Sequence, residues 1–131
     1  MHVRRTARAV SQFYDNYMQE AGITAAQFTL LIALVLAPDT SVTKLSSVLG
    51  TDRTTLSRSL KPLEEAGIVL TEPGEDKRKK VVTLTKKGKS VLDKAIPRWM
   101  EAQEAFVDKM GQGNWQDFIS KLNTAAVISK I

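Results

Sequence analysis

The sequence predicts a mostly α-helical protein with one small β-hairpin. Three observations lead to this fold class. Apolar residues recur at alternating spacings of three and four near both ends of the chain, which is the period of one helix face. In the middle, two short helical patterns are separated by a single glycine and a tight turn. After them, two β patterns flank the Pro-Gly-containing stretch PGEDKRK.

Two helices are predicted in the first third of the chain. The first covers residues 3–21 and ends at Gly22, with an apolar stripe made of Val3, Ala7, Val10, Tyr14, Tyr17 and Ala21. Thr24, with Gln27 three residues later, predicts a capping box for a second helix over residues 25–36. That helix is apolar nearly all round, so we expect it at the centre of the core.

The middle of the chain predicts a helix-turn-helix. A short helix over residues 43–49 should face inward through Leu45, Val48 and Leu49. A tight turn follows at Gly50. Two helices joined by a short glycine-containing turn are typical of this motif.

The second helix of the motif is predicted over residues 53–66. Asp52 is well suited to cap its exposed amides, and Gly67 follows its end. Pro62 lies inside it and removes one internal hydrogen bond, so we expect a bent or tightened final turn.

A hairpin and two more helices complete the predicted order. The strands are residues 68–71 and 80–84. Thr85 then predicts the N-cap of a long helix reaching about Lys109, bent at Pro97. The GQGN stretch breaks the chain, and a last helix is expected over residues 115–129.

Composition excludes several classes of function. The 131 residues contain no cysteine and one histidine, His2. Disulfides, thiolate metal sites and cysteine nucleophiles are therefore excluded, and a catalytic triad or metal site would depend on one terminal ring. We expect no enzyme activity, no metal and no cofactor. With no apolar leader and no long apolar run, we expect a soluble cytoplasmic protein.

The positive charge is concentrated in the middle of the chain. The net charge is +5, and residues 40–89 carry all of it, with eleven Lys and Arg against six Asp and Glu. A basic centre between neutral arms is typical of a nucleic-acid-binding module on a scaffold. A lysine-rich, solvated face is the alternative on charge alone.

The helix over residues 53–66 predicts the reading surface. Leu56, Leu60 and Leu63 fall within roughly 60° of each other on a helical wheel and should face the core. The opposite side, centred on Thr54, Arg58 and Lys61, carries long cations and short hydroxyls, which suit base edges and phosphates in a major groove. The candidate DNA-binding residues are Lys44, Arg53, Thr54, Thr55, Ser57, Arg58, Lys61, Lys77, Arg78 and Lys79.

The last three candidates lie in the hairpin loop, within the cationic run from Lys77 to Lys80. Such a run repels itself unless it meets an anion. Arg78 suits a narrow minor groove, where the negative potential is enhanced. Asp76 lies two residues earlier and is placed to orient the Arg78 guanidinium by a charge-assisted bond.

These segments resemble the MarR family of winged-helix transcriptional regulators. The resemblance is carried by AQFTLLIAL, by TKLSSVLGTDRTTLSRSLKPLEEAGIV and by EDKRKKVVTLTKKG, and it covers nearly all of the chain. The most specific match is the loop, with Asp76 and Arg78 followed by the strand ending Thr83-Leu84-Thr85 and then Gly88. The predicted fold is therefore a winged helix-turn-helix whose N- and C-terminal helices form a dimerisation arm.

The resemblance implies a homodimer held by the terminal helices. Residues 1–131 then form one domain, with a DNA-binding lobe over 24–89 and dimerisation helices over 1–21 and 90–131. It also implies that the helix from Arg53 reads the major groove of a pseudo-palindromic operator and that Arg78 enters the minor groove. Family members usually repress transcription, and many release DNA on binding small, often aromatic, anionic ligands.

Two alternatives remain at this point. A winged-helix module that binds proteins rather than DNA would have the same fold, although Arg58, Lys61 and the cationic loop argue against it. An effector pocket is the second open question. Its candidate residues are Phe13, Tyr14, Tyr17, Phe28 and Trp99. Packing of these rings in the core and in the dimer is the favoured interpretation.

Overall fold

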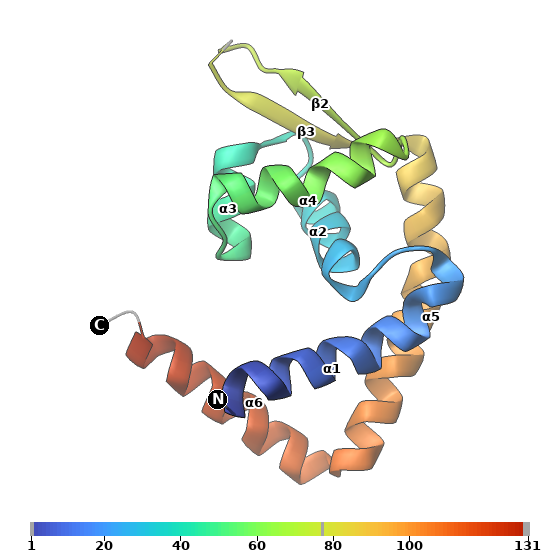
Figure 1. The fold of residues 1–131 in the computed structure, drawn as a ribbon, viewed down its shortest axis with the longest axis vertical. Coiled ribbons are helices and arrows are strands. Elements are labelled where there is room, and N and C mark those ends of the chain that lie inside the picture. Colours follow the sequence, from blue (N-terminus) through green and yellow to red (C-terminus); the bar gives the residue numbers. More distant parts are fainter. Residues whose placement is uncertain (1, 77, 130–131) are drawn as a thin grey trace.

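The computed structural model describes residues 2–76 and 78–129. It is mostly helical with one small antiparallel sheet, as predicted (Figure 1). The elements, in chain order, are α1 (His2–Met18), the 3-10 helix η1 (Gln19–Ala21), α2 (Ala25–Leu36), β1 (Thr40–Ser41), α3 (Val42–Leu49), α4 (Arg53–Glu65), β2 (Val69–Pro73), β3 (Lys80–Leu84), α5 (Lys86–Met110) and α6 (Gln112–Ser129).

Helices α2, α3 and α4 pack with the sheet into one lobe, with the hairpin β2–β3 projecting from it (Figure 1). The strand order is β1-β3-β2, with Thr40 opposite Val82 and Val69 opposite Leu84. The core of the lobe consists of buried aliphatic side chains, including Leu31, Leu45, Leu56, Leu63 and Val82. Helix α2 contributes Phe28, Leu30, Leu31 and Leu34 to it, which confirms that α2 is the central helix.

Local capping signals account for where the helices begin. The Thr24 hydroxyl accepts the Gln27 backbone N–H, and the Gln27 side chain accepts the Thr24 N–H, so the predicted capping box is present. The side chains of Asp52 and Thr85 likewise cap α4 and α5.

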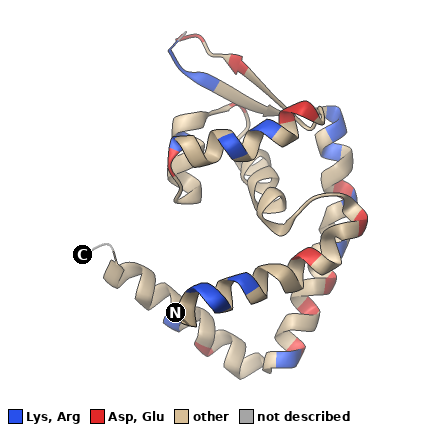
Figure 2. Ribbon diagram, in the orientation of Figure 1, with Lys and Arg blue, Asp and Glu red and all other residues tan. Residues whose placement is uncertain are grey.

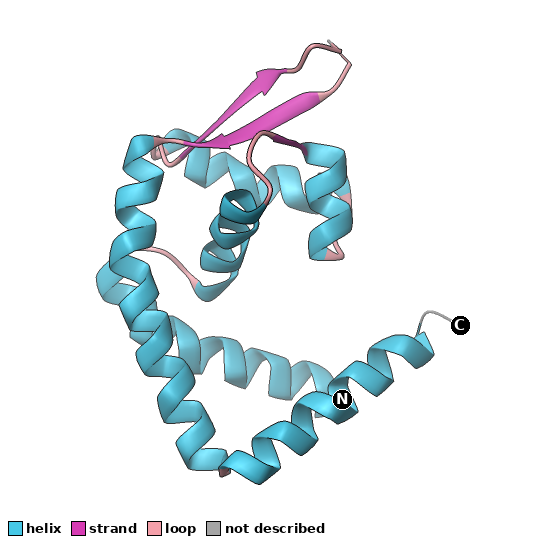
Figure 3. Ribbon diagram, turned by 180° about the vertical axis from the view of Figure 1, so that it is seen from behind, coloured by secondary structure: helices cyan, strands magenta, loops and turns pink. Residues whose placement is uncertain are grey.

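Helices α1, α5 and α6 extend away from the lobe as an arm (Figures 1 and 3). Helix α5 is shared by both parts: it starts beside the hairpin and ends at α6. It remains one continuous helix through Pro97 and curves along its length (Figures 1 and 3). Helix α6 buries none of its described side chains.

The structure corrects several sequence predictions. Strand β1 was not predicted, because a two-residue strand is formed only by its pairing with β3, some 40 residues away. Val48 was wrongly assigned to the core: it lies on the outer face of α3 and is 64% exposed. Helix α6 begins at Gln112, so only Gly111 breaks the chain.

Smaller shifts affect the ends of other elements. Strand β2 is displaced toward Pro73, and α4 ends at Glu65 rather than at Ala66. Ala66 N–H still bonds to the Pro62 carbonyl, so Pro62 does not end the helix. Among the described residues, no single helix has the length and apolarity needed to span a membrane; α1 with η1 and α2 meet that test only together, across a 72° bend.

Candidate nucleic-acid interface

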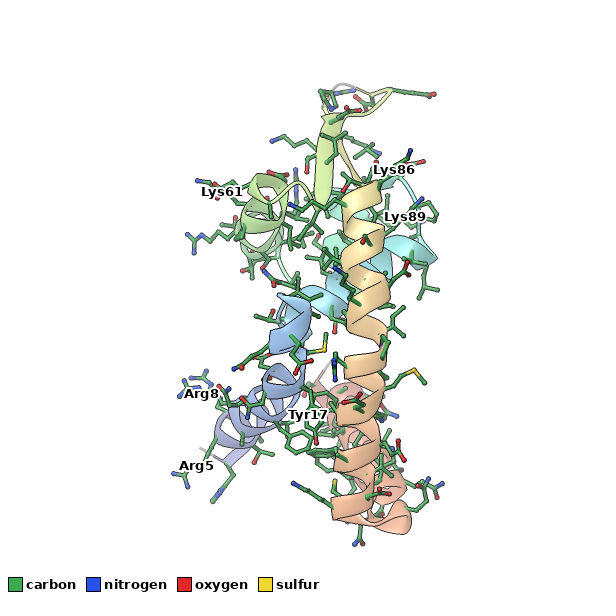
Figure 4. All side chains as sticks on the ribbon, turned by 90° about the vertical axis from the view of Figure 1, so that its right-hand side faces the viewer. Arg5, Arg8, Tyr17, Lys61, Lys86 and Lys89 are labelled. Carbon is green, nitrogen blue, oxygen red and sulfur yellow. The ribbon has the colours of Figure 1, made fainter. Side chains whose placement is uncertain are left out.

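Helix α4 presents a polar face because three leucines hold its other face in the core. Leu56, Leu60 and Leu63 are each at most 2% exposed, as the wheel predicted. The outer positions are all exposed, and they are Arg53, Thr54, Thr55, Ser57, Arg58 and Lys61. Figure 4 shows the Lys61 side chain pointing straight out from the lobe.

The turn before α4 is fixed by hydrogen bonds to α3. Thr51 N–H bonds to the Ser46 carbonyl at 3.0 Å, and the buried Ser46 hydroxyl donates to the Thr43 carbonyl at 2.8 Å. Gly50 takes a left-handed φ of 67° in this turn, a conformation that glycine adopts without strain. Lys44, in the first turn of α3, is exposed. The turn is therefore closed onto the end of α3, and α3 and α4 meet in the core through the buried Leu45 and Leu56.

The first turn of α4 is capped by a charged group. Asp52 Oδ1 accepts the Thr55 backbone N–H at 2.7 Å. This backbone hydrogen bond, together with the contact to the Thr55 side chain, lowers the pKa of the Asp52 carboxyl below its ordinary value of 3.8. The carboxylate also lies at the positive end of the helix dipole.

The hairpin tip is organised around Asp76. Its Oδ1 accepts the Arg78 backbone N–H at 3.1 Å and lies 3.5 Å from Arg78 Nε, so the predicted pairing is present. Across the loop, Gly74 N–H bonds to the Lys79 carbonyl and Lys79 N–H to the Asp76 carbonyl, both at 2.8 Å. The Arg78 side chain remains 92% exposed, and Lys79 is exposed too. The predicted contact Lys77 lies outside the described residues.

Three links join the hairpin and α5 to the end of α4. The Thr71 hydroxyl donates to the Glu64 carboxylate. The Thr85 hydroxyl lies 2.6 Å from the Gly67 carbonyl, and Lys87 Nζ donates to the Ala66 carbonyl at 2.6 Å. Sequence reasoning missed these contacts, although Thr85 had been recognised as a cap. They fix the hairpin relative to the exposed face of α4.

Cations dominate this side of the molecule. Figure 2 shows Lys and Arg along α4 and on the hairpin, with acidic residues at the end of α4. None of the ion pairs found between described residues involves Arg53, Arg58 or Lys61. The arrangement presents unneutralised positive charge and hydroxyl donors, which suits a polyanion.

The five aromatic candidates for an effector pocket come together, but they pack against one another. The rings of Phe28 and Trp99 stack with centroids 5.7 Å apart, and Tyr14 lies 6.3 Å from Trp99. Phe13 is within 5.8 Å of both Tyr14 and Tyr17. The cluster joins α1, α2 and α5, which favours the packing interpretation.

A polar contact completes this cluster. The Tyr14 hydroxyl donates to Gln103 Oε1 at 2.5 Å, and burial raises the pKa of Tyr14 above 10.0.

The hollows described in the structure lie elsewhere. One of about 470 Å³ runs between α2 and α4 past Thr24, Leu49 and Ser59, and one of about 480 Å³ lies between α1 and α6.

Comparison with known proteins identifies the family. A family model described as "MarR family" matches residues 21–79, which run from the end of η1 through α2, α3, α4 and β2 to the hairpin loop. The Mycobacterium tuberculosis transcriptional regulator MosR, in its crystal structure in complex with DNA, has a sequence 32% identical to this one. The two folds superpose with a TM-score of 0.84 over 99% of this chain and 96% of that chain. The chain belongs to the MarR family.

Other transcriptional regulators are similar to this chain in sequence or in fold. The uncharacterised HTH-type transcriptional regulator YwoH of Bacillus subtilis is 26% identical over 102 residues, 78% of this chain and 74% of YwoH. The transcriptional repressor CouR, solved on a 23-mer DNA duplex and also with p-coumaroyl-CoA, resembles this chain in fold. In the DNA complex it is 24% identical, with a TM-score of 0.86, over 95% of this chain and 89% of CouR. The MarR family and these relatives are transcriptional regulators, not enzymes, as expected.

Proposed function

We propose that this MarR-family protein is a homodimeric, sequence-specific DNA-binding regulator that represses transcription and acts in the cytoplasm. The observation that carries the proposal is the exposed row of cations and hydroxyls on α4, held outward by three buried leucines. In this proposal α4 enters the major groove, where an Arg side chain bonds guanine O6 and N7. Arg78, exposed at the hairpin tip, enters the adjacent minor groove.

The other candidates are assigned by their positions. Arg58 and Lys61 lie at the centre of the exposed face and are proposed to contact bases or phosphates, with Lys44 and Arg53 on the flanking backbone. Thr54, Thr55 and Ser57 are short hydroxyl donors that allow close approach, and the exposed Lys79 supports Arg78 in the loop. Lys77 is proposed as a contact from the sequence alone.

The proposed dimer follows from apolar surface that one chain leaves open. Val3, Val127 and Ile128 are each more than 60% exposed on α1 and α6. The hollow between these helices is lined mainly by apolar side chains, including Val10, Phe118 and Leu122. A second copy would cover these side chains and place two α4 helices one helical turn apart on DNA. Residues 24–89 are then the DNA-binding lobe, and 1–21 with 90–131 the dimerisation helices.

Release by a small aromatic or anionic ligand is the regulatory part of the proposal. The cluster of Tyr14, Phe28 and Trp99 joins the arm to the lobe, so a ligand that separates these rings would move one relative to the other. Quenching or a spectral shift of tryptophan fluorescence on titration with aromatic carboxylates, coupled to loss of DNA binding, is the expected result. Tight operator binding at saturating ligand would contradict it.

DNA binding is tested by selecting duplexes from a random pool and titrating the bound sequence at several salt concentrations. We expect log affinity to fall steeply and linearly with log salt. The alternative function, a winged-helix module that binds proteins, predicts no retained duplex and no such dependence. A pool that yields no enriched sequence at low salt would overturn the proposal.

A further inference from the structure

We propose that the arginines at the start of α1 form a second DNA-contacting surface, which binds phosphates in the central part of the operator. This inference rests on the proposed function and extends its site. Arg4, Arg5 and Arg8 are all exposed on the first two turns of α1. They belong to the helix that forms the arm rather than to the lobe that carries α4 (Figure 2).

The three arginines share one face of α1. At 100° per residue they fall within about 100° of each other, on the side opposite Val3, Ala7 and Val10. Those three apolar residues line the hollow beside α6. The apolar face of α1 therefore turns toward this hollow and α6, and the cationic face points away from it.

The local energetics of α1 do not favour cations there. The first turn contains no acidic residue, and positive charge at a helix N-terminus is opposed by the helix dipole. Arg8 is also three and four residues from Arg5 and Arg4, spacings at which like charges repel. An external anion bound to these arginines would offset both effects.

Acidic side chains of the described residues do not neutralise the α1 arginines. None of the ion pairs between described residues involves Arg4, Arg5 or Arg8. The one acid in α1 is Asp15, about two turns after Arg8, and its carboxylate accepts the Ala25 N–H at 2.7 Å.

The direction in which the α1 arginines point indicates that their anionic partner is the DNA bound by α4. In Figure 4, Arg5 and Arg8 project to the same side of the molecule as Lys61 of α4, whereas Lys86 and Lys89 project to the other side. A duplex lying against α4 therefore faces the α1 arginines as well. The start of α1 lines the same hollow as α6, the helix that meets the second copy in the proposed dimer. In that dimer the two copies of the arginine surface would lie between the two α4 helices, over the centre of the operator.

The test compares two charge-matched double variants on the selected operator. Arg5→Gln/Arg8→Gln removes two cations from the proposed surface, and Lys86→Gln/Lys89→Gln removes two from the opposite side. Each phosphate contact contributes about 0.9 to the slope of log affinity against log salt, so loss of four contacts per dimer lowers the slope by up to about 3.6. We expect this decrease for the arginine variant, an unchanged slope for the lysine variant, and the wild-type slope for Arg5→Lys/Arg8→Lys.

A second measurement locates the contact. Neutral methylphosphonates in the central operator phosphates should weaken the wild type and leave the arginine variant unaffected, while the preference for operator over random duplex stays the same. Equal slopes for both double variants would overturn the inference, as would an arginine variant that is monomeric at the assay concentration. If the wild type binds no duplex, the proposed function fails first; if Arg58→Ala weakens binding but the α1 variant does not, only this inference fails.

Discussion

The carboxylate of Asp52 accepts the backbone N–H of Thr55 at 2.7 Å, and this bond fixes the first turn of the helix that carries the candidate DNA contacts. Asp52→Ala removes the cap and should lower the melting temperature, whereas Asp52→Asn keeps an acceptor and should lower it less. Thermal unfolding followed by circular dichroism measures both. Equal melting temperatures for the wild type and the Ala variant would show that the cap contributes nothing.

The same bond makes part of the stability depend on pH. Because the folded state lowers the Asp52 pKa below 3.8, the cap's contribution is present above that value and is lost as pH falls through the lowered pKa. The difference in unfolding free energy between the wild type and Asp52→Asn should therefore shrink as pH falls from about 6 to about 3. A difference that stays constant would contradict this assignment.

Gly88 packs against the backbone at the base of the hairpin. A Cβ at this position would lie 2.6 Å from Leu84 Cδ1 and closer still to the Ile68 carbonyl oxygen. Gly88→Ala should therefore cost about 1–3 kcal/mol of stability through overpacking. Gly113→Ala is the matched control, because a Cβ there meets nothing within 4 Å and alanine favours the helix. Urea unfolding of both variants should give opposite signs, and a Gly88→Ala variant as stable as wild type would be inconsistent with the packing.

Arg58 lies on the exposed face of α4, above the buried Leu56 and Leu60. In the proposed complex, Arg58→Ala should weaken binding by about 1–3 kcal/mol and relax the preference at one or two base pairs. Binding to single-base variants of the selected duplex measures this. Uniform weakening across all duplexes would instead assign Arg58 to a phosphate.

The Asp76 carboxylate orients Arg78: it accepts the Arg78 backbone N–H and lies close to the Arg78 guanidinium. Arg78→Ala should weaken operator binding by about 1–3 kcal/mol if the side chain enters a groove. Arg78→Lys keeps the charge but loses the planar donor set, so it should recover only part of the affinity. An unchanged affinity for Arg78→Ala, measured by fluorescence anisotropy, would remove the hairpin from the interface.

Leu122 is 47% exposed and lines the apolar hollow between α6 and α1. If a second copy covers it, Leu122→Ala should raise the dimer dissociation constant by roughly tenfold to a hundredfold. Leu36→Ala is the control, since Leu36 is 80% exposed at the end of α2 in the lobe. Analytical ultracentrifugation at low concentration checks both, and a Leu122→Ala variant as dimeric as the control would argue against this interface.

Local signals in the sequence predicted most of the fold. The caps at Thr24, Asp52 and Thr85 depend on one side chain and the next few amides, so they can be recognised without tertiary structure. Strand β1 could not be predicted in this way, because Thr40 is extended only through its pairing with Val82 in β3. Asp39, just before it, takes a positive φ of 54° and accepts a hydrogen bond from Thr83.

The sequence predicted the residues of the candidate interface, but not the hydrogen bonds that join α4 to the hairpin and α5. Apolar spacing placed Leu56, Leu60 and Leu63 correctly because all three face one core. The assignment of Val48 to the core was wrong because the short helix α3 has too few residues for apolar spacing to define its buried side. The hydrogen bond between Thr71 and Glu64 could not be predicted from the sequence, because it joins β2 to α4 and only the fold determines how these two elements lie relative to each other.

Helix α5 connects the hairpin to α6 as one continuous helix. Its 25 residues correspond to about 37 Å of rod, with one end beside the hairpin and the other at α6. A tilt of about 5° at the α6 end would displace the hairpin end by about 3 Å, close to the rise of one base step along a DNA strand. In the proposed dimer, a small change in how the two α6 helices pack would therefore be enough to move the hairpin out of register with a groove.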